Sequence, residues 1–295
     1  MRILVTGAFG FTGRHFIAQA QKQGHECVAL SNKEHLEFVG IKTIVSDLTD
    51  KEALVTRLKT EQFDAVVHLA AISFVAHGNI NEIYDTNLIG TINLVDVVNQ
   101  LSSKPVHFVI ASSGNIYGNA KQLPIVEESE FNPANDYAAS KCAMEMALKV
   151  RSHNTTITVV RPFNYTGAGQ AEHFLIPKIV AAFNRGDTSI ELGNLDVSRD
   201  FTDVRDLVTA YLALLETRQE GIFNVCSGEA TSLTNIVKMC EKLSGRSIEV
   251  TVNPAFVRSN EVKVLYGDDR KLRRAIGDYR KYCIEETLAW MLLEQ

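Results

Sequence analysis

Short apolar runs alternate with longer amphipathic stretches through the first half of the chain. The runs have the length of β-strands and occupy residues 3–6, 26–30, 43–45, 65–70 and 106–111. The stretches between and after them carry apolar residues at helical spacing, over residues 12–23, 51–59, 82–100 and 137–151. Strands that are apolar on both faces and separated by helices are typical of a parallel sheet covered on both sides. The first half therefore predicts a doubly wound α/β fold.

The second half mixes helices and strands, and no repeat or linker divides it from the first. We expect strands at 156–161, 190–192, 222–225 and 248–252, and helices at 176–183, 205–215 and 233–243. Because no change in composition marks a boundary, we expect two interwoven parts. The first is residues 1–165, to which some later segments return, and the second is a smaller lobe formed mainly by residues 166–295.

Composition narrows the class of partner. The 295 residues carry a net charge of −5, and no basic tract stands out, so we expect a small-molecule ligand and no nucleic acid. The five cysteines are scattered without a C-x-x-C pair, which predicts no metal site and a reducing, cytoplasmic setting. We expect no membrane span and no signal peptide, because the chain has no apolar run of about 18 residues and begins directly with a strand.

A glycine-rich turn lies between the first predicted strand and the first predicted helix. Its glycines are Gly7, Gly10 and Gly13, with Phe9 and Phe11 between them. The first glycine allows a tight turn, the second lets the backbone approach a pyrophosphate, and the third lets helix and strand pack closely. The helix N-terminus offers free N–H groups to the phosphates. This order predicts a Rossmann dinucleotide site, the alternative being a turn without a ligand.

The end of the second predicted strand bears on which dinucleotide binds. An Asp or Glu at this place would hold the ribose hydroxyls of NAD, and the chain instead continues from Leu30 into Ser31, Asn32 and Lys33. The serine and asparagine side chains are able to hydrogen-bond a 2′-phosphate, and the lysine is able to neutralise it. We therefore expect NADPH, with NADH as the alternative, unless Lys33 is only a solvated loop charge.

Three residues form a candidate catalytic set. Tyr137 and Lys141 lie four residues apart in a predicted helix and so share a face. A lysine ammonium beside a phenol lowers the phenol pKa, so we expect Tyr137 to exchange a proton with the substrate near neutral pH. Ser113 follows strand 106–111, at the edge where parallel sheets bind ligands. Alone, the Tyr-x-x-x-Lys pattern is common by chance, and the other features give it weight.

The order of the glycine turn, Ser113, Tyr137 and Lys141 resembles the extended short-chain dehydrogenase/reductase family, and the resemblance extends over essentially the whole chain. It implies that Ser113 hydrogen-bonds the substrate oxygen, that Tyr137 transfers the proton and that Lys141 also holds the nicotinamide ribose. It further implies cofactor contacts by Asp47, Leu48, Leu69, Ala70 and Ala71. For Asp47, a role in a turn or as a helix N-cap is an equal alternative.

The segment from Arg161-Pro162-Phe163-Asn164 to Gly167-Ala168-Gly169-Gln170 resembles sugar-nucleotide enzymes around GDP-mannose 4,6-dehydratase, and within them GDP-6-deoxy-4-keto-hexose reductases. This resemblance implies a nucleoside-diphosphate sugar as substrate. The implied substrate-binding residues are Ser73, Ser113, Asn164, Lys178, Arg199, Arg258 and Glu261. For Arg199 the alternative is a salt bridge with Asp200 or Asp203, and for Arg205 a salt bridge is the favoured interpretation.

Dehydratases of this family carry an acid pair directly after the catalytic Ser or Thr, where this chain has Gly114 and Asn115. Neither residue transfers that proton, so dehydration is disfavoured. We expect NAD(P)H-dependent reduction of the C4 ketone of a nucleotide-linked 4-keto-6-deoxyhexose, with GDP, dTDP or CDP as the nucleotide. The alternatives are a nucleotide-sugar 4-epimerase and a non-catalytic NADP-binding regulatory protein. A combined epimerase and reductase would need further acid–base groups, for which we expect neither Cys142 nor His173 to serve.

Apolar stripes on helices 82–100 and 137–151 resemble those with which relatives form a dimeric four-helix bundle. We therefore expect a homodimer through these helices. The alternative is that both stripes only pack on the chain's own sheet.

Overall fold

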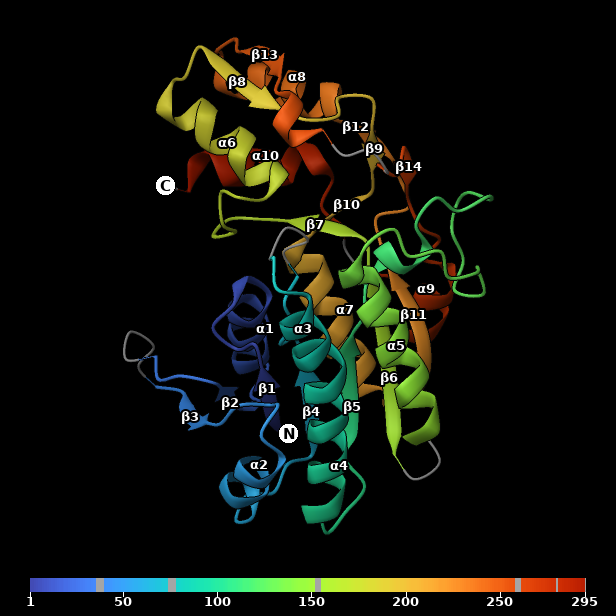
Figure 1. Cartoon of the computed structure of the whole chain (residues 1–295). Coiled ribbons are helices and arrows are strands. Elements are labelled where there is room, and N and C mark those ends of the chain that lie inside the picture. The colour runs from blue at the N-terminus through green and yellow to red at the C-terminus, as the bar shows by residue number, and fades with distance from the viewer. Residues whose placement is uncertain (36–39, 74–77, 152–154, 258–260, 280, 295) are drawn as a thin grey trace.

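The chain folds around a seven-stranded sheet, shown in the computed structural model of Figure 1, which describes residues 1–35, 40–73, 78–151, 155–257, 261–279 and 281–294. In spatial order the strands are β11 (Gly221–Val225), β6 (Thr156–Pro162), β5 (His107–Ala111), β4 (Ala65–His68), β1 (Arg2–Thr6), β2 (Glu26–Ser31) and β3 (Lys42–Val45). All neighbouring pairs are parallel. The strand order reverses between β1 and β4, which is where such sheets bind ligands. The predicted doubly wound fold is confirmed.

Helices cover both faces of this sheet. One face carries α1 (Phe11–Lys22), α7 (Val204–Glu216) and α9 (Arg270–Ile276), and the other carries α2 (Lys51–Leu58), α4 (Thr91–Leu101) and α5 (Asp136–Arg151). Successive residues of β1 alternate between the two cores: Ile3 and Val5 pack in the first and Leu4 in the second. The strands are therefore apolar at every position because both of their faces are buried. In the described residues, no helix is both long and apolar enough to cross a lipid bilayer.

Most of the elements after β6 form a lobe beyond the carboxyl ends of the strands (Figure 1). Its core lies between α6 (Leu175–Arg185), α8 (Leu233–Ser244), α10 (Ile284–Leu293) and the paired strands β8 (Ser189–Leu192) and β13 (Glu249–Val252). Strand β7 (Asn164–Thr166) pairs with β10 (Phe201–Asp203) between sheet and lobe. Three further strands, β9 (Ser198–Arg199), β12 (Thr231–Ser232) and β14 (Val264–Leu265), make a small sheet. Segments of two or three residues are too short for periodicity to predict.

The helix expected over residues 82–100 is present, but a π-helical segment interrupts its α-helical geometry. The structure has α3 (Ile80–Tyr84), a π-helical segment (Asp85–Gly90) and α4. Within the π-helical segment, the Asn87 side chain accepts from Ile72 N at 2.9 Å, and donates to Ile72 O at 3.1 Å and to Ser140 Oγ at 3.0 Å. These three bonds link the loop after β4 to α5. They give a physical reason for the π-helical geometry here, since π-helical segments are frequent where a side chain has a specific task.

The sheet is completed by residues that come late in the chain. Strand β11 pairs with β6, and α7 packs against α1 on the same face. Between β6 and β11 the chain leaves the sheet, builds part of the lobe through α6 and β8, and returns. The division into residues 1–165 and 166–295 stays a prediction, and this return limits how independent the first part is.

A fragment of residues 1–165 should not fold by itself. It would lack β11, α7 and α9, so one edge of β6 and the apolar side of α1 would face water. Urea denaturation followed by circular dichroism should give a broad, shallow change for the fragment and a cooperative transition for the full chain. A sharp transition of the fragment, with the slope expected for its size, would contradict this.

Candidate active site

A cleft of about 980 Å³ opens at the carboxyl edge of the sheet, between the sheet and β7 of the lobe. Every glycine of the N-terminal turn lines it, as do Ser113, Tyr137 and Lys141. Residues that lie 130 positions apart in the sequence, such as Gly7 and Tyr137, thus meet in one cavity. The size suits a nucleotide-sized ligand.

The glycine turn fits a dinucleotide. Gly7 has a φ of +64°, and a Cβ there would lie 2.8 Å from Ala70 N, while one at Gly13 would lie 2.2 Å from Gly7 O. The turn therefore requires glycine at both positions, and its backbone faces the cleft at the start of α1. An acidic residue in the first turn of α1 would repel a phosphate, and this turn contains none. Phe9, Gly10 and Phe11 also line the cleft, as predicted.

The other predicted cofactor-binding residues are brought together in part. Cleft-lining residues include Ser31, Asn32, Asp47, Leu48, Leu69, Ala70 and Ala71. The side chain of Asp47 also accepts from the backbone N and the hydroxyl of Thr49, both at 2.8 Å, so its alternative role in a turn is real. Lys33 is exposed and does not line the cleft. His35 does line it and packs on Phe9 with ring centroids 4.1 Å apart, a contact that sequence reasoning missed.

Ser113 and Tyr137 face each other in the cleft. Ser113 lies just beyond β5, at the N-cap of a short 3₁₀ helix (Gly114–Tyr117), and its hydroxyl accepts from Asn115 N at 3.2 Å. Tyr137 is 9% exposed. Burial raises the pKa of Tyr137 to about 12, although its hydrogen bond with Ser113 acts in the opposite direction. The phenol is therefore protonated at neutral pH.

The expectation that Lys141 lowers the pKa of Tyr137 is wrong for this structure. The Lys141 ammonium donates to Ala111 O at 2.8 Å and lies 4.0 Å from Met144 Sδ. Burial lowers the pKa of Lys141 itself to about 8, with the charge of Glu145 opposing that shift. Because burial penalises both charged forms, it outweighs the effect of the i,i+4 spacing on the phenol.

A buried ion pair fixes α5, which carries Tyr137 and Lys141, to β6. Glu145 on α5 accepts from Arg161 of β6 at 2.9 Å and 2.6 Å, and both side chains are at most 2% exposed. Ser112 donates to the same carboxylate at 2.5 Å. Arg161 also donates to Tyr117 at 2.7 Å. Sequence reasoning missed Glu145, although its place one helical turn after Lys141 was visible.

On the substrate side, Asn164 and Ser73 line the cleft. The Asn164 Oδ1 atom is buried and has no hydrogen-bond partner among the described residues. A buried amide oxygen without a partner costs about 1 to 3 kcal/mol, so Asn164 fits a residue that a ligand completes.

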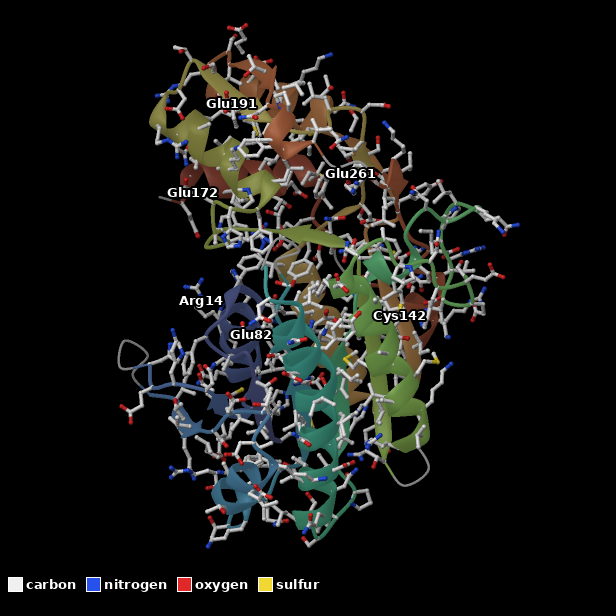
Figure 2. The ribbon with its side chains drawn as sticks, viewed as in Figure 1. Arg14, Glu82, Cys142, Glu172, Glu191 and Glu261 are labelled. Atoms are coloured by element: carbon white, nitrogen blue, oxygen red, sulfur yellow. The ribbon has the colours of Figure 1, made fainter. Side chains whose placement is uncertain are left out.

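The other predicted substrate residues lie elsewhere in the lobe. Arg199 forms a salt bridge, as its alternative interpretation expected, but with Glu261 at 2.5 Å instead of Asp200 or Asp203. Neither Arg199 nor Glu261 lines the cleft, and Figure 2 shows Glu261 within the lobe. Asp200 instead accepts from Ser227 and Gly228. Lys178 donates to Glu191 O at 2.7 Å and also lies outside the cleft lining.

Arg258 falls outside the described residues. The salt bridge expected for Arg205 is confirmed, with Asp203 at 2.7 Å. Cys142 packs against the buried cluster that contains Tyr117 and Phe163 and does not line the cleft. His173 is exposed and packs on Phe174.

The place of the dehydratase acids is tight for a side chain at its first position. A Cβ on Gly114 would lie 3.1 Å from the Phe163 ring, and Phe163 is buried. At the second position, Asn115 lines the cleft with an amide that does not ionise. The tight contact at Gly114 and the neutral amide of Asn115 both indicate that this edge of the cleft carries no proton donor for elimination.

Residues 4–291 match the family model of GDP-mannose 4,6 dehydratase. The chain is 35% identical to a GDP-6-deoxy-D-talose 4-dehydrogenase of Aggregatibacter actinomycetemcomitans, over 100% of this chain and 99% of the relative. It is 32% identical to a GDP-6-deoxy-D-mannose reductase of Pseudomonas aeruginosa, over 99% and 96%.

Two solved structures share the whole fold. A candidate epimerase from Burkholderia cenocepacia J2315 is 42% identical with a TM-score of 0.91, over 99% of this chain and 96% of the other. The RMD protein of Pseudomonas aeruginosa, solved with NADPH, is 30% identical with a TM-score of 0.86, over 99% and 98%.

Replacing Lys141 should change how stability depends on pH. The folded-state pKa of about 8 lies below the ordinary 10.5, so Lys141 contributes stability that is present above pH 10.5 and lost as the pH falls through 8. The free energy of unfolding of the wild type, relative to Lys141→Met, should therefore rise by about 3 kcal/mol between pH 7 and pH 10.5. Urea denaturation at each pH measures this difference. The exposed Lys104→Met is the matched control, and an equal pH dependence of the two variants would contradict the assignment.

Proposed function

The chain belongs to the GDP-mannose 4,6-dehydratase family, and from this premise we propose that it uses NADPH to reduce the C4 ketone of a nucleotide-linked 4-keto-6-deoxyhexose. The observation that carries the proposal is the meeting of Ser113, Tyr137 and the glycine turn in one cleft whose acid positions hold Gly114 and Asn115. Such a cleft has the groups for ketone reduction and lacks those for elimination.

The chain's own residues supply the proton and the orientation. A nicotinamide dinucleotide whose pyrophosphate is bound by the glycine turn would supply a hydride to the ketone carbon. Ser113 hydrogen-bonds the ketone oxygen, and Tyr137 donates its phenolic proton to the alkoxide that develops there. Lys141, 2% exposed at the same cleft, holds positive charge beside the developing anion and offers its ammonium to the ribose.

The protonated state of Tyr137 fits its proposed role. Reduction of a ketone needs the phenol as an acid. Because burial raises the pKa of Tyr137 to about 12, the acid form is the one present at neutral pH. An epimerase needs the same acid when it re-reduces its ketone, so the cofactor balance is what separates the two reactions.

The substrate class follows from the relatives and from Asn164. Two relatives over nearly the whole chain are named for GDP-linked 6-deoxyhexoses, which supports GDP over dTDP or CDP. The unpartnered Asn164 Oδ1 is an acceptor suited to a sugar or ribose hydroxyl. Arg199 and Arg258 stay predicted ligands of the diphosphate.

A 4-epimerase is the second candidate, because a solved structure of a candidate epimerase is 42% identical to this chain. The two activities differ in cofactor balance. A reductase consumes one NADPH per product, while an epimerase returns its cofactor unchanged. The third candidate, a binding protein without turnover, would have no use for the Ser113 and Tyr137 pair.

The test mixes the protein with NADPH and GDP-, dTDP- or CDP-linked 4-keto-6-deoxyhexose and follows NADPH absorbance. We expect one NADPH oxidised per sugar reduced, fastest with the GDP sugar, and slower reaction with NADH. Product without NADPH loss would indicate the epimerase instead. No reaction with any sugar would favour the binding protein.

Tyr137→Phe should lower kcat by about 10² to 10⁴ while the Kd for NADPH changes little, because the phenol acts on the substrate oxygen. Tyr279→Phe is the matched control, since its buried hydroxyl has no partner among the described residues and lies outside the cleft lining. An active Tyr137→Phe variant would remove the proposed proton donor.

We also propose a homodimer through α3, α4 and α5. Exposed apolar side chains gather on α3, the π-helical segment and α5: Ile80, Ile89, Met146 and Val150, which are 42% to 73% exposed. Analytical ultracentrifugation should find a dimer, and Ile89→Asp with Met146→Glu should make it a monomer. Val252→Glu, 52% exposed on the lobe, is the control and should stay dimeric. A monomeric wild type would contradict the proposal.

A further inference from the structure

The start of α1 is joined to the segment that follows β6 by direct side-chain contacts. The hydrogen-bonded pairs are Thr12 Oγ1 with Tyr165 OH at 2.8 Å, Arg14 Nη2 to Gly169 O at 2.9 Å, and His15 Nε2 to Ala168 O at 3.0 Å. Figure 2 shows Arg14 near the end of α1 that faces the lobe. Three successive polar positions near the start of one helix therefore bond to one strand and its following loop.

Aromatic rings strengthen this junction. Phe11 stacks on Tyr165 with ring centroids 6.0 Å apart and planes 10° from parallel. His15 meets Trp290 of α10 edge-on at 5.8 Å. Phe11 and Thr12 belong to the glycine turn, and Tyr165 directly follows Asn164, the residue whose amide oxygen has no partner.

Tyr165 is in turn fixed within the lobe. Strand β7 pairs with β10 in the register Tyr165 to Thr202. Asp203, at the end of β10, caps α7 and accepts from Thr287 of α10 at 2.7 Å. A shift of Tyr165 would therefore also displace β10 and α10, which belong to the lobe.

We infer that the Thr12–Tyr165 hydrogen bond couples the two ligand sites, so that the dinucleotide and the nucleoside diphosphate each tighten binding of the other. This inference rests on the proposed function, which supplies the two ligands. Thr12 and Tyr165 act as positioning residues: a ligand that orders the glycine turn also orders Tyr165 and its neighbour Asn164. The second ligand then binds to a segment that is already ordered.

The test is calorimetric titration of NADPH into the full-length protein, with and without a saturating nucleoside diphosphate. GDP, dTDP and CDP are compared first, and the tightest binder is used. We expect the diphosphate to lower the Kd for NADPH about fivefold, and NADPH to lower the Kd for the diphosphate by the same factor, because coupling between two sites is reciprocal. One hydrogen bond contributes a factor of about this size.

Thr12→Val and Tyr165→Phe should each reduce the coupling to within about twofold, and the double variant should lose no more than either one, since the hydroxyls act as one pair. Thr12→Ser keeps the hydroxyl and should restore the coupling. Thr217→Val and Tyr279→Phe are matched controls away from the cleft and should keep it.

The failures are distinguishable. If NADPH or every diphosphate fails to bind the wild type, the proposed function fails and the coupling with it. If both bind but neither changes the affinity of the other, only the coupling is overturned. The coupling is also overturned if Thr12→Val weakens NADPH binding equally with and without the diphosphate, because the hydroxyl would then contact only one ligand.

Discussion

The ion pair between Glu145 and Arg161 is the interaction on which the catalytic geometry depends. It joins α5, which carries Tyr137 and Lys141, to β6, and through Ser112 to the loop that carries Ser113. Removing one partner of such a buried pair costs about 3 to 5 kcal/mol, a large part of the stability of a typical domain. Ser113 and Tyr137, which must meet the same substrate oxygen, are therefore both positioned through the carboxylate of Glu145.

Burial sets the chemistry of the site as much as its shape. Both Tyr137 and Lys141 lie where charged forms are disfavoured, so the pKa of the phenol is raised and that of the ammonium is lowered. Tyr137 accordingly keeps its proton at neutral pH, and the Lys141 ammonium loses its proton at a lower pH than an exposed lysine does. A protonated phenol beside a bound ketone is the proton donor that ketone reduction requires.

Features of the fold and site that depend on local spacing were predictable, and those that depend on distant partners were not. The glycine turn, Ser113 and Tyr137 follow from the order of strands and helices, since parallel strands present their ends at one edge. The spacing of hydrophobic residues cannot identify the partner of Arg199, whose ion pair with Glu261 spans 62 positions. Nor does the i,i+4 spacing reveal that burial would reverse the expected shift in the pKa of Tyr137.

The late return of β11 to the sheet has a consequence during synthesis. When β6 has left the ribosome, the partner for its free edge has not yet been made, because β11 follows the first part of the lobe. At about 5 to 20 residues per second, that edge waits several seconds for its neighbour. An unpaired strand edge is a template for pairing with other chains, so the nascent protein passes through an interval in which it depends on dilution or on chaperones.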